Sequence, residues 1–347
     1  INLAKVQALF FPLMILLIGL SNLLVIYIGG KQYLDGTISD IGIIAEFIIY
    51  VNMLTWPVAS IGWISSIIQQ AEASQKRINE FLNKRSEIEN ISPNKSSKID
   101  GEIIFKNVTY KYLETEIIAT KNVSFILKKG SKLGITGSTG SGKSTLMNLI
   151  CRLYDIEEGE ILIDNNPVKK INLKSLRESI GYVPQDTFLF SDTIMNNIKF
   201  GLNNATENDV INACKTAKIH NEIMNFDKGY ETLLGERGIN LSGGQKQRIS
   251  IARALIKKPK ILILDDCLSA MDTETEKAIL RSLEDYTKGI TSIIISHRIS
   301  SIKNADNIIV LENGSIVQQG THNQLINQNG YYKQLYYKQI IKKETTE

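Results

Sequence analysis

Residues 137–144 read GSTGSGKS, and this stretch decides the fold of the chain. It matches G-x-x-x-x-G-K-[ST] at every fixed position. An apolar run at 132–136 leads directly into it, and a helical pattern follows over 145–153. Strand, glycine-rich loop and helix are the context that a P-loop requires, and the backbone N–H groups of such a loop wrap phosphate groups. The stretch therefore predicts an α/β fold with a phosphate site at the end of a strand.

Two side chains of the loop and one acidic residue downstream complete a nucleotide site. Lys143 is expected to reach the β- and γ-phosphates, and the hydroxyl of Ser144 to hold Mg²⁺. Asp265 follows the apolar run 261–264. A carboxylate at the C-terminal end of a parallel strand faces the ligand crevice, where it would bind Mg²⁺ directly or through water. An apolar run that ends in Asp is common by itself, so this assignment depends on the P-loop upstream.

Residues 241–245, LSGGQ, are a second phosphate-binding device. One Ser and two Gly supply a hydroxyl and bare backbone N–H groups, which at a helix N-terminus would make an anion site for a γ-phosphate. Because the chain already has a P-loop, the sequence raises the question of whose nucleotide this second device serves.

Two further residues are suited to the chemistry of the γ-phosphate. Gln185, in GYVPQD at 181–186, offers a neutral oxygen that can sense Mg²⁺ and the attacking water. His297 follows the apolar run 292–295 and can donate a hydrogen bond to transition-state charge. A lone His is more often a surface residue, but its place after a core strand favours the catalytic interpretation.

The N-terminal part has a different character. No charged side chain occurs from Val6 to Gly30, and a second apolar run up to Gln70 contains only Glu46. Each run is long enough to cross a hydrocarbon core of about 30 Å, so a transmembrane hairpin is predicted. The alternative is a buried hairpin of a soluble protein, whose helices rarely stay uncharged for so long. The basic residues outside the hairpin place both ends in the cytoplasm and the loop outside; they are Lys5, Lys76, Arg77, Lys84 and Arg85.

Composition narrows the function classes. A chain of 347 residues has room for two domains. The net charge of +4 gives no indication of a nucleic-acid partner. The scattered cysteines Cys151, Cys214 and Cys267 indicate neither disulfides nor a zinc site. We expect the hairpin and its helical extension at 1–82, a linker rich in Ser, Asn and Lys at 83–100, and a soluble α/β domain with a parallel core sheet at 101–347. The first two strands of this domain are expected at 102–112 and near 123–127.

With these motifs in place, residues 101–347 resemble the nucleotide-binding domain of ABC (ATP-binding cassette) exporters. The matching pieces are the P-loop at 137–145, GYVPQD at 181–186, GERG at 235–238, LSGGQ at 241–245, RISIARAL at 248–255, SHRIS at 296–300 and the tail from Gly314 to Gly330. The resemblance implies a RecA-like P-loop NTPase core, an antiparallel β-subdomain and an inserted helical subdomain at about 188–247. The hairpin looks like the last two transmembrane helices of a half-exporter, which has six, so the first four are expected to be missing from this chain.

The resemblance also implies the site residues. The residues expected to bind ATP are Tyr112 (stacking on adenine), Gly137, Ser138, Thr139, Gly140, Ser141, Gly142, Lys143, Ser144, Thr145, Ser242, Gly243, Gly244 and Gln245. The expected Mg²⁺ ligands are Ser144, Gln185 and Asp265, and the expected catalytic residues are Asp266, His297 and Gln185. In the family, ATP lies between the P-loop of one chain and the LSGGQ of the other.

One position departs from the family pattern. The general base after the strand is normally Glu, and here it is Asp266. Asp is one methylene shorter, and a base displaced by about 1 Å can cost on the order of a hundredfold in rate. We therefore expect this P-loop site to bind ATP but hydrolyse it poorly, as in the degenerate half of heterodimeric exporters, while LSGGQ completes a partner site that carries Glu. The alternative is a tolerated variant with modest slowing.

The hypothesis is an integral membrane subunit with a cytoplasmic ATPase domain. Paired with a second half-transporter, it would couple Mg-ATP hydrolysis to export of a small molecule, lipid or peptide that the motifs do not specify. The alternatives are a homodimer that turns over slowly, a non-transport LSGGQ ATPase acting on DNA, and an ATP-gated channel or regulatory subunit. The hairpin and the absence of a basic surface argue against the DNA-acting class.

Overall fold

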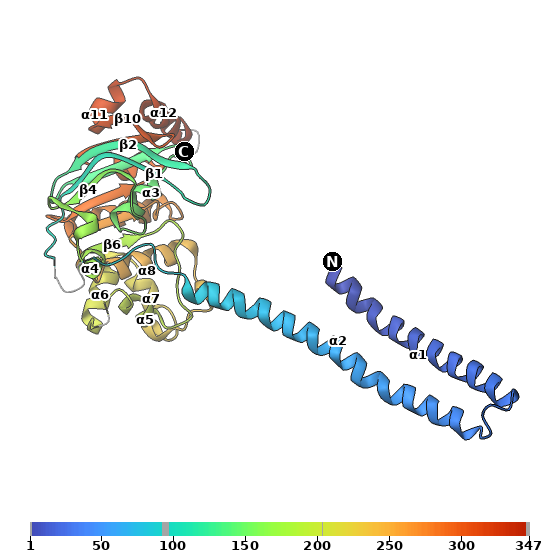
Figure 1. Cartoon of the computed structure of the whole chain (residues 1–347). Helices are drawn as coiled ribbons and strands as arrows, with labels where there is room; N and C mark the ends of the chain where they lie inside the picture. The colour runs from blue at the N-terminus through green and yellow to red at the C-terminus, as the bar shows by residue number, and fades with distance from the viewer. Residues whose placement is uncertain (1, 92–96, 203, 345–347) are drawn as a thin grey trace. The chain divides into compact units, whose positions relative to one another are not determined.

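A computed structural model describes residues 2–91, 97–202 and 204–344. The chain divides into two compact units, with the boundary between Ser86 and Glu87. The first unit is a pair of long helices and the second contains all the strands (Figure 1).

The first unit consists of α1 (Asn2–Leu34) and α2 (Gly42–Asn83). Its apolar stretches, Ala8–Leu34 and Gly42–Asn83, have mean hydropathies of 2.5 and 1.5 and are long enough to cross a membrane. Within the described residues their most apolar windows contain no buried residue, whereas a core hairpin of a soluble protein would be mostly covered. The two helices approach closely at Gly29, where a β-carbon would lie 2.9 Å from Cγ1 of Ile44. Small residues allow such close packing between apolar helices.

The second unit contains two sheets. The smaller has the order β2-β1-β4-β5 and is antiparallel. The larger has the order β10-β9-β3-β8-β7-β6, with β10 antiparallel and the others parallel. The strands are β1 (Ile103–Lys111), β2 (Ile118–Leu127), β3 (Lys132–Gly137), β4 (Glu158–Ile163), β5 (Asn166–Pro167), β6 (Ile180–Val183), β7 (Ile261–Asp265), β8 (Thr291–Ile295), β9 (Asn307–Glu312) and β10 (Ser315–Gly320). The predicted α/β fold with a parallel core sheet is confirmed.

Helices cover the strands and link them. They are α3 (Lys143–Ile150), α4 (Leu173–Ser179), α5 (Ile194–Lys199), α6 (Glu207–Thr216), α7 (His220–Met224), α8 (Gly243–Leu255), α9 (Thr273–Tyr286), α10 (Ile299–Ile302), α11 (His322–Asn327) and α12 (Tyr331–Glu344). The short 3₁₀ helices are η1 (Val168–Lys170), η2 (Gly229–Glu231) and η3 (Glu236–Gly238). Four α-helices, α5 to α8, lie between β6 and β7 in the sequence.

The core strands alternate between two apolar cores. Along β7, Ile261 and Ile263 join the core shared with the smaller sheet and α3, while Leu262 and Leu264 join the core shared with α5 to α9. Successive strand side chains point to opposite faces, so a continuous apolar run is what a sheet covered on both faces needs. This explains why the runs at 261–264 and 292–295 carry no alternating pattern.

Two predicted element boundaries differ from the structure. The helix after the P-loop was expected at 145–153, but α3 begins at Lys143 and ends at Ile150. It begins early because Gly142 adopts a left-handed conformation directly before it, and Arg152 leaves the helix with φ +48°. The second strand was expected at 123–127, but β2 begins at Ile118, where it pairs with Lys111 of β1.

Candidate nucleotide-binding site

The P-loop connects β3 to α3 and is shaped by two glycines. Gly137 has φ +148°, and a β-carbon there would lie 2.0 Å from the carbonyl oxygen of Leu311. Gly142 has φ +93°, and its β-carbon would lie 2.1 Å from the carbonyl oxygen of Ala119. By contrast, Gly140 is exposed and a β-carbon there would meet nothing within 4 Å. The loop is thus pinned at both ends and open in its middle, which suits a cradle for phosphate groups.

Lys143 fills this cradle with its ammonium group. Nζ donates to the carbonyl oxygens of Ser138 at 2.7 Å and Gly137 at 3.1 Å. Burial lowers the pKa of Lys143, and the charges of Asp265 and Asp266 oppose that effect. The ammonium therefore lies among loop carbonyls and beside two carboxylates, where negative phosphate oxygens would be favourable partners.

Asp265, the last residue of β7, lies beside Ser144. Its carboxylate is buried, and burial raises its pKa while hydrogen bonds from Ser144 and Tyr182 oppose the rise. The phenol of Tyr182 donates to Oδ2 of Asp265 at 3.4 Å. One hydroxyl and one carboxylate, with phosphate oxygens and water, are the donor set that Mg²⁺ takes in phosphate-transfer sites. Within the described ranges no group of three His, Cys, Asp or Glu side chains forms a separate metal site.

Asp266 and His297 lie together at the ends of β7 and β8. Asp266 has φ +45°, and its backbone N–H donates to the carbonyl oxygen of Ile295 at 3.0 Å. Burial raises the pKa of the Asp266 carboxyl, while the charge of His297 and its backbone N–H lower it. The two predicted catalytic residues are therefore in contact. Gln185 is exposed just beyond the end of β6.

Tyr112 lies directly after β1 and reaches the P-loop helix. Its hydroxyl and Oγ1 of Thr145 are 3.0 Å apart. Its ring meets Tyr110 and Tyr154 edge to face, with centroids 5.1 Å and 5.5 Å away. Tyr154 was not a predicted site residue; in the sequence it is an isolated aromatic after α3.

The LSGGQ segment forms the start of α8. Oγ of Ser242 accepts from the Gln245 N–H at 3.2 Å, and Oε1 of Gln245 accepts from the Ser242 N–H at 2.9 Å. This capping box fixes the helix start, while Ser242 and Gly243 are exposed. Glu222 of α7 accepts from Nε2 of Gln245 at 3.1 Å and also pairs with Arg248. Glu222 was not predicted, because nothing in its local sequence distinguishes it from a surface acid.

An ion pair with one buried partner holds the segment that follows Asp266. Glu276 of α9 is 2% exposed, pairs with Arg298 and accepts from Oγ of Ser301 at 2.5 Å. Arg298 also donates to the carbonyl oxygen of Ser269 at 2.9 Å. A β-carbon at Gly243 would touch Ala270 of the same segment at 3.5 Å. The segment 266–272 thus connects Asp266, one of the two predicted catalytic residues, with the LSGGQ helix.

The sequence pattern of the ABC transporter family matches residues 120–269, which include the P-loop, LSGGQ and the end of β7. These residues form an ABC transporter ATP-binding domain. The fold of the whole chain, a helical hairpin followed by this α/β unit, is that of an ABC exporter. A solved structure described as a bacterial Atm1-family ABC exporter with ATP bound matches 87% of this chain and 53% of that chain, with a TM-score of 0.74 and 35% identity.

Curated ABC proteins are similar over nearly the whole chain. The uncharacterized ABC transporter ATP-binding protein YknU of Bacillus subtilis is 41% identical over 334 residues, which are 96% of this chain and 57% of that protein. The multidrug resistance-like ATP-binding protein MdlA of Escherichia coli is 40% identical over 338 residues, 97% of this chain and 57% of that protein. The chain therefore spans a little over half the length of these relatives.

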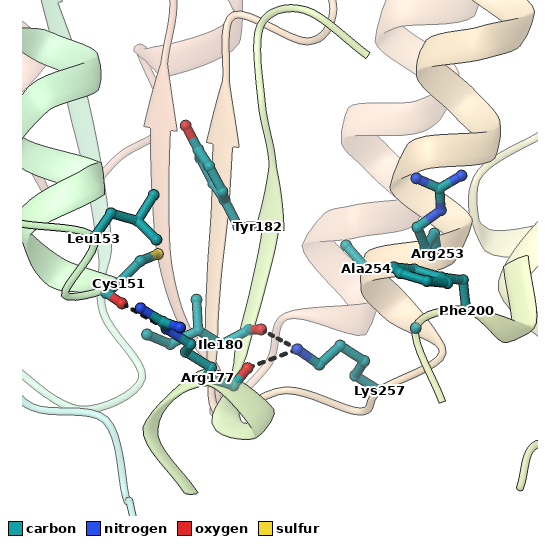
Figure 2. A pocket seen from close by; sticks show the side chains of 10 residues that line it. Cys151, Leu153, Arg177, Ile180, Tyr182, Phe200, Arg253, Ala254 and Lys257 are labelled. Carbon is teal, nitrogen blue, oxygen red and sulfur yellow. Dashed lines mark hydrogen bonds between the residues drawn. The ribbon is translucent and has the colours of Figure 1, made fainter. Parts of the chain in front are cut away.

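A cavity of about 300 Å³ lies beside the site of this ABC domain (Figure 2). Figure 2 shows Nζ of Lys257 reaching the carbonyl oxygens of Arg177, at 2.6 Å, and Ile180, at 2.8 Å. Tyr182 lines the cavity, and its hydroxyl is the group that bonds to Asp265. The other lining residues are Cys151, Leu153, Phe200, Gly201, Arg253 and Ala254. The Tyr182 side chain thus both lines this cavity and contacts the candidate Mg²⁺ ligand Asp265.

Proposed function

We propose that the chain is the ATP-binding and permease subunit of an ABC exporter, which couples Mg-ATP binding and hydrolysis in a dimer of cassettes to export of a substrate. The observation that carries the proposal is that one unit contains both a P-loop and an exposed LSGGQ segment, two candidate phosphate-binding sites. The P-loop is pinned by Gly137 and Gly142, and the exposed LSGGQ segment starts a capped helix. The exposed LSGGQ segment can bind the γ-phosphate of a nucleotide that is held by the P-loop of another chain.

The residues of the P-loop side have separate roles in this proposal. The loop amides and Lys143 bind the phosphates, Tyr112 carries the adenine, and Ser144, Asp265 and Gln185 hold Mg²⁺. The bound metal would neutralise charge on the β- and γ-phosphates. Asp266 would polarise the attacking water, and His297 would donate a hydrogen bond to the charge that develops on the γ-phosphate.

We propose further that this chain's own site is the weaker one of a heterodimer. The backbone of Asp266 is fixed by its hydrogen bond to Ile295 and by contact of its carboxylate with His297. A shorter side chain on a fixed backbone leaves its carboxylate farther from the γ-phosphate. The LSGGQ segment is unaltered, so it would complete a partner site that carries Glu. A homodimer with two slow sites is the second candidate.

The cavity next to Tyr182 supports coupling to the membrane domain. Phe188, Phe190 and Phe200 are 50%, 39% and 63% exposed, and Arg253 lies over the rings of Phe190 and Phe200. An exposed aromatic group beside a cavity suits an apolar partner. We propose that intracellular loops of the exporter's membrane domain dock here and beside Glu236. Tyr182 and Gln185 would then couple the position of these loops to the state of the nucleotide site. The hairpin would supply two helices of that membrane domain, with the ATPase domain in the cytoplasm.

The substrate is proposed only as a class, namely a small molecule, lipid or peptide. The multidrug resistance-like name of MdlA is consistent with a small molecule. Recovery of the chain in the detergent-extracted membrane fraction would exclude the DNA-acting alternative. Directional uptake of a substrate into inverted vesicles would exclude a channel.

One experiment tests the proposal directly. ATP hydrolysis is measured for the chain alone, for Asp266→Glu, and for the chain assembled with the half-exporter encoded beside it. We expect the assembled pair to be much faster than the chain alone, and Asp266→Glu to raise turnover by at least several-fold. Equal rates for the chain and the pair, with no gain in Asp266→Glu, would reject the degenerate-site heterodimer. No hydrolysis in any preparation would reject the ATPase.

A further inference from the structure

Gln339 of the C-terminal helix α12 hydrogen-bonds to the backbone of the candidate catalytic residue His297 and to that of Ile299, two residues farther along. Nε2 of Gln339 donates to the carbonyl oxygen of His297 at 2.6 Å. The N–H of Ile299 donates to Oε1 of Gln339 at 2.9 Å. The carbonyl needs a donor and the N–H needs an acceptor, so only one orientation of the Gln339 amide satisfies both.

The bond from the Ile299 N–H to Gln339 satisfies a backbone group that has no partner within its own helix. Ile299 is the first residue of the short helix α10, and the first N–H groups of a helix have no partner within it. Arg298, which occupies the N-cap position, gives no side-chain cap. The Gln339 oxygen serves that N–H from an element 40 residues farther along the chain.

The same histidine backbone also touches the candidate base. The N–H of His297 bonds to the carboxylate of Asp266, while its carbonyl oxygen accepts from Gln339. His297 is therefore held at both of its backbone polar groups, one by the base and one by α12. A shift of Gln339 would be transmitted to the side chain of His297 and to the place of the Asp266 carboxylate.

The helix that carries Gln339 is itself fixed in the core. Tyr332 of α12 is fully buried, and its hydroxyl lies 2.7 Å from Nδ1 of His322. Its backbone N–H donates to Oε1 of Gln318 in β10 at 3.1 Å. Leu335 and Tyr336, about one turn further along α12, pack against the same core. Gln339 thus projects from an anchored helix and can hold the backbone of residues 297–299 in place.

We infer that Gln339 is a positioning residue for ATP hydrolysis, which holds His297, and through it Asp266, in the geometry that the γ-phosphate requires. This inference rests on the proposed function and assigns to the C-terminal helix a part in it. It predicts that the rate of the hydrolytic step depends on an amide that never touches the nucleotide.

The test uses the assembled exporter with Asp266→Glu in this chain and with the proposed catalytic Glu of the partner's site replaced by Gln, so that the measured turnover comes from this chain's own site. Gln339→Met keeps the size of the side chain and removes both hydrogen bonds. The matched control is Gln334→Met, the same change at an exposed position of the same helix. We expect Gln339→Met to lower kcat roughly tenfold with KM within about twofold, because misplaced catalytic groups affect the transition state more than binding. The control should leave both constants unchanged.

A second variant separates positioning from general damage. Gln339→Glu places a carboxylate, which cannot donate, against the His297 carbonyl oxygen. When protonated, the same group has one O–H donor and one acceptor and can restore both bonds. The ordinary pKa of Glu is about 4.3, and a carboxylate placed against a carbonyl oxygen titrates above that value. The activity of Gln339→Glu relative to its Asp266→Glu parent should therefore rise as the pH falls from about 7.5 to about 5, whereas the relative activity of Gln339→Met should stay flat.

The outcomes distinguish the two proposals. Equal kcat values for Gln339→Met and Gln334→Met, or a pH-independent ratio for Gln339→Glu, would overturn the positioning role while leaving the ATPase intact. If the assembled exporter hydrolysed no ATP, the proposed function and the catalytic role of Gln339 would both fail. Hydrogen exchange at the Ile299 amide would still report on the contact itself, since it should be faster in Gln339→Met than in Gln334→Met if Gln339 holds that amide.

Discussion

Gly137 lies against the carbonyl oxygen of Leu311, so closely that a β-carbon on Gly137 would be 2.0 Å from that oxygen. The contact joins the end of β3 to the neighbouring strand β9 at the point where the P-loop begins. Two consequences follow from it, one for stability and one for the nucleotide. The loop cannot move toward β9, and its amides point in the direction that the sheet imposes.

Gly137→Ala should destabilise the domain strongly. The substitution needs a left-handed backbone with φ +148° and a displacement of β9, and overpacking of this kind costs about 3 kcal/mol. Gly140→Ala is the matched control, because Gly140 has φ +77° with nothing within 4 Å, and should cost only about 1 kcal/mol. Urea unfolding followed by circular dichroism measures both. Equal destabilisation would show that the Leu311 contact is unimportant.

Replacing Tyr112 should weaken nucleotide binding through its ring and not through its hydroxyl. Stacking of a base on an aromatic ring contributes about 1–3 kcal/mol, so Tyr112→Ala should raise the Kd for ATP roughly tenfold or more. Tyr112→Phe loses only the 3.0 Å contact with Thr145 and should bind nearly as the wild type does. Fluorescent-nucleotide titration distinguishes the two variants. A large loss in Tyr112→Phe would instead assign the main role to the hydroxyl.

The core of the fold could be predicted because its signals are local. The run 261–264 and the loop 137–144 are each contiguous, and their order dictates strand, turn and helix. The start of β2 could not be predicted, since residues 118–122 become a strand through pairing with β1 and not through an apolar pattern of their own. The early start of α3 depends on the left-handed Gly142, a conformation that the sequence permits but does not require.

The residues that support the site could not be predicted from the sequence, for a related reason. Glu222, Glu276 and Gln339 act on residues 20 or more positions away, so their importance arises only when the chain is folded. Tyr182 lies within a recognised motif, yet its bond to Asp265 joins two neighbouring strands, and no spacing rule indicates it. Motifs identify the groups that touch a ligand, whereas tertiary contacts identify the groups that hold them.

Breaking the Glu276–Arg298 pair should be costly. Glu276 is 2% exposed and loses its bonds to Arg298 and Ser301 on truncation, whereas the Arg298 side chain is 35% exposed, so water solvates the charge that is left and the cost should be about 2 kcal/mol. Glu276→Ala should therefore lower the free energy of unfolding by about that amount, and also slow ATP hydrolysis by loosening segment 266–272. The control is Asp285→Ala, which breaks the exposed pair with Lys288 and should cost less than about 0.5 kcal/mol. Similar losses in both variants would contradict this account.

Asp209 should make the helical segment between β6 and β7 sensitive to acid. It completes the capping box of α6 with Thr206 and pairs with Lys258. Hydrogen bonds from Thr206 and Lys258 lower the pKa of its carboxyl to about 2, against about 3.9 for an unfolded chain. Because the folded-state pKa is the lower one, the stabilisation is present above about pH 4 and is lost as the pH falls toward 2.

Asp209→Asn should therefore lower Tm at pH 5 to 7 by a constant amount, and the difference from wild type should shrink between pH 4 and pH 2. Differential scanning fluorimetry over this range measures it. Thr206→Ser retains an N-cap hydroxyl and a donor to Asp209, so it should follow the wild-type curve at every pH. A Tm difference for Asp209→Asn that stayed the same at pH 2 and pH 6 would mean that the carboxylate stabilises α6 without its charge.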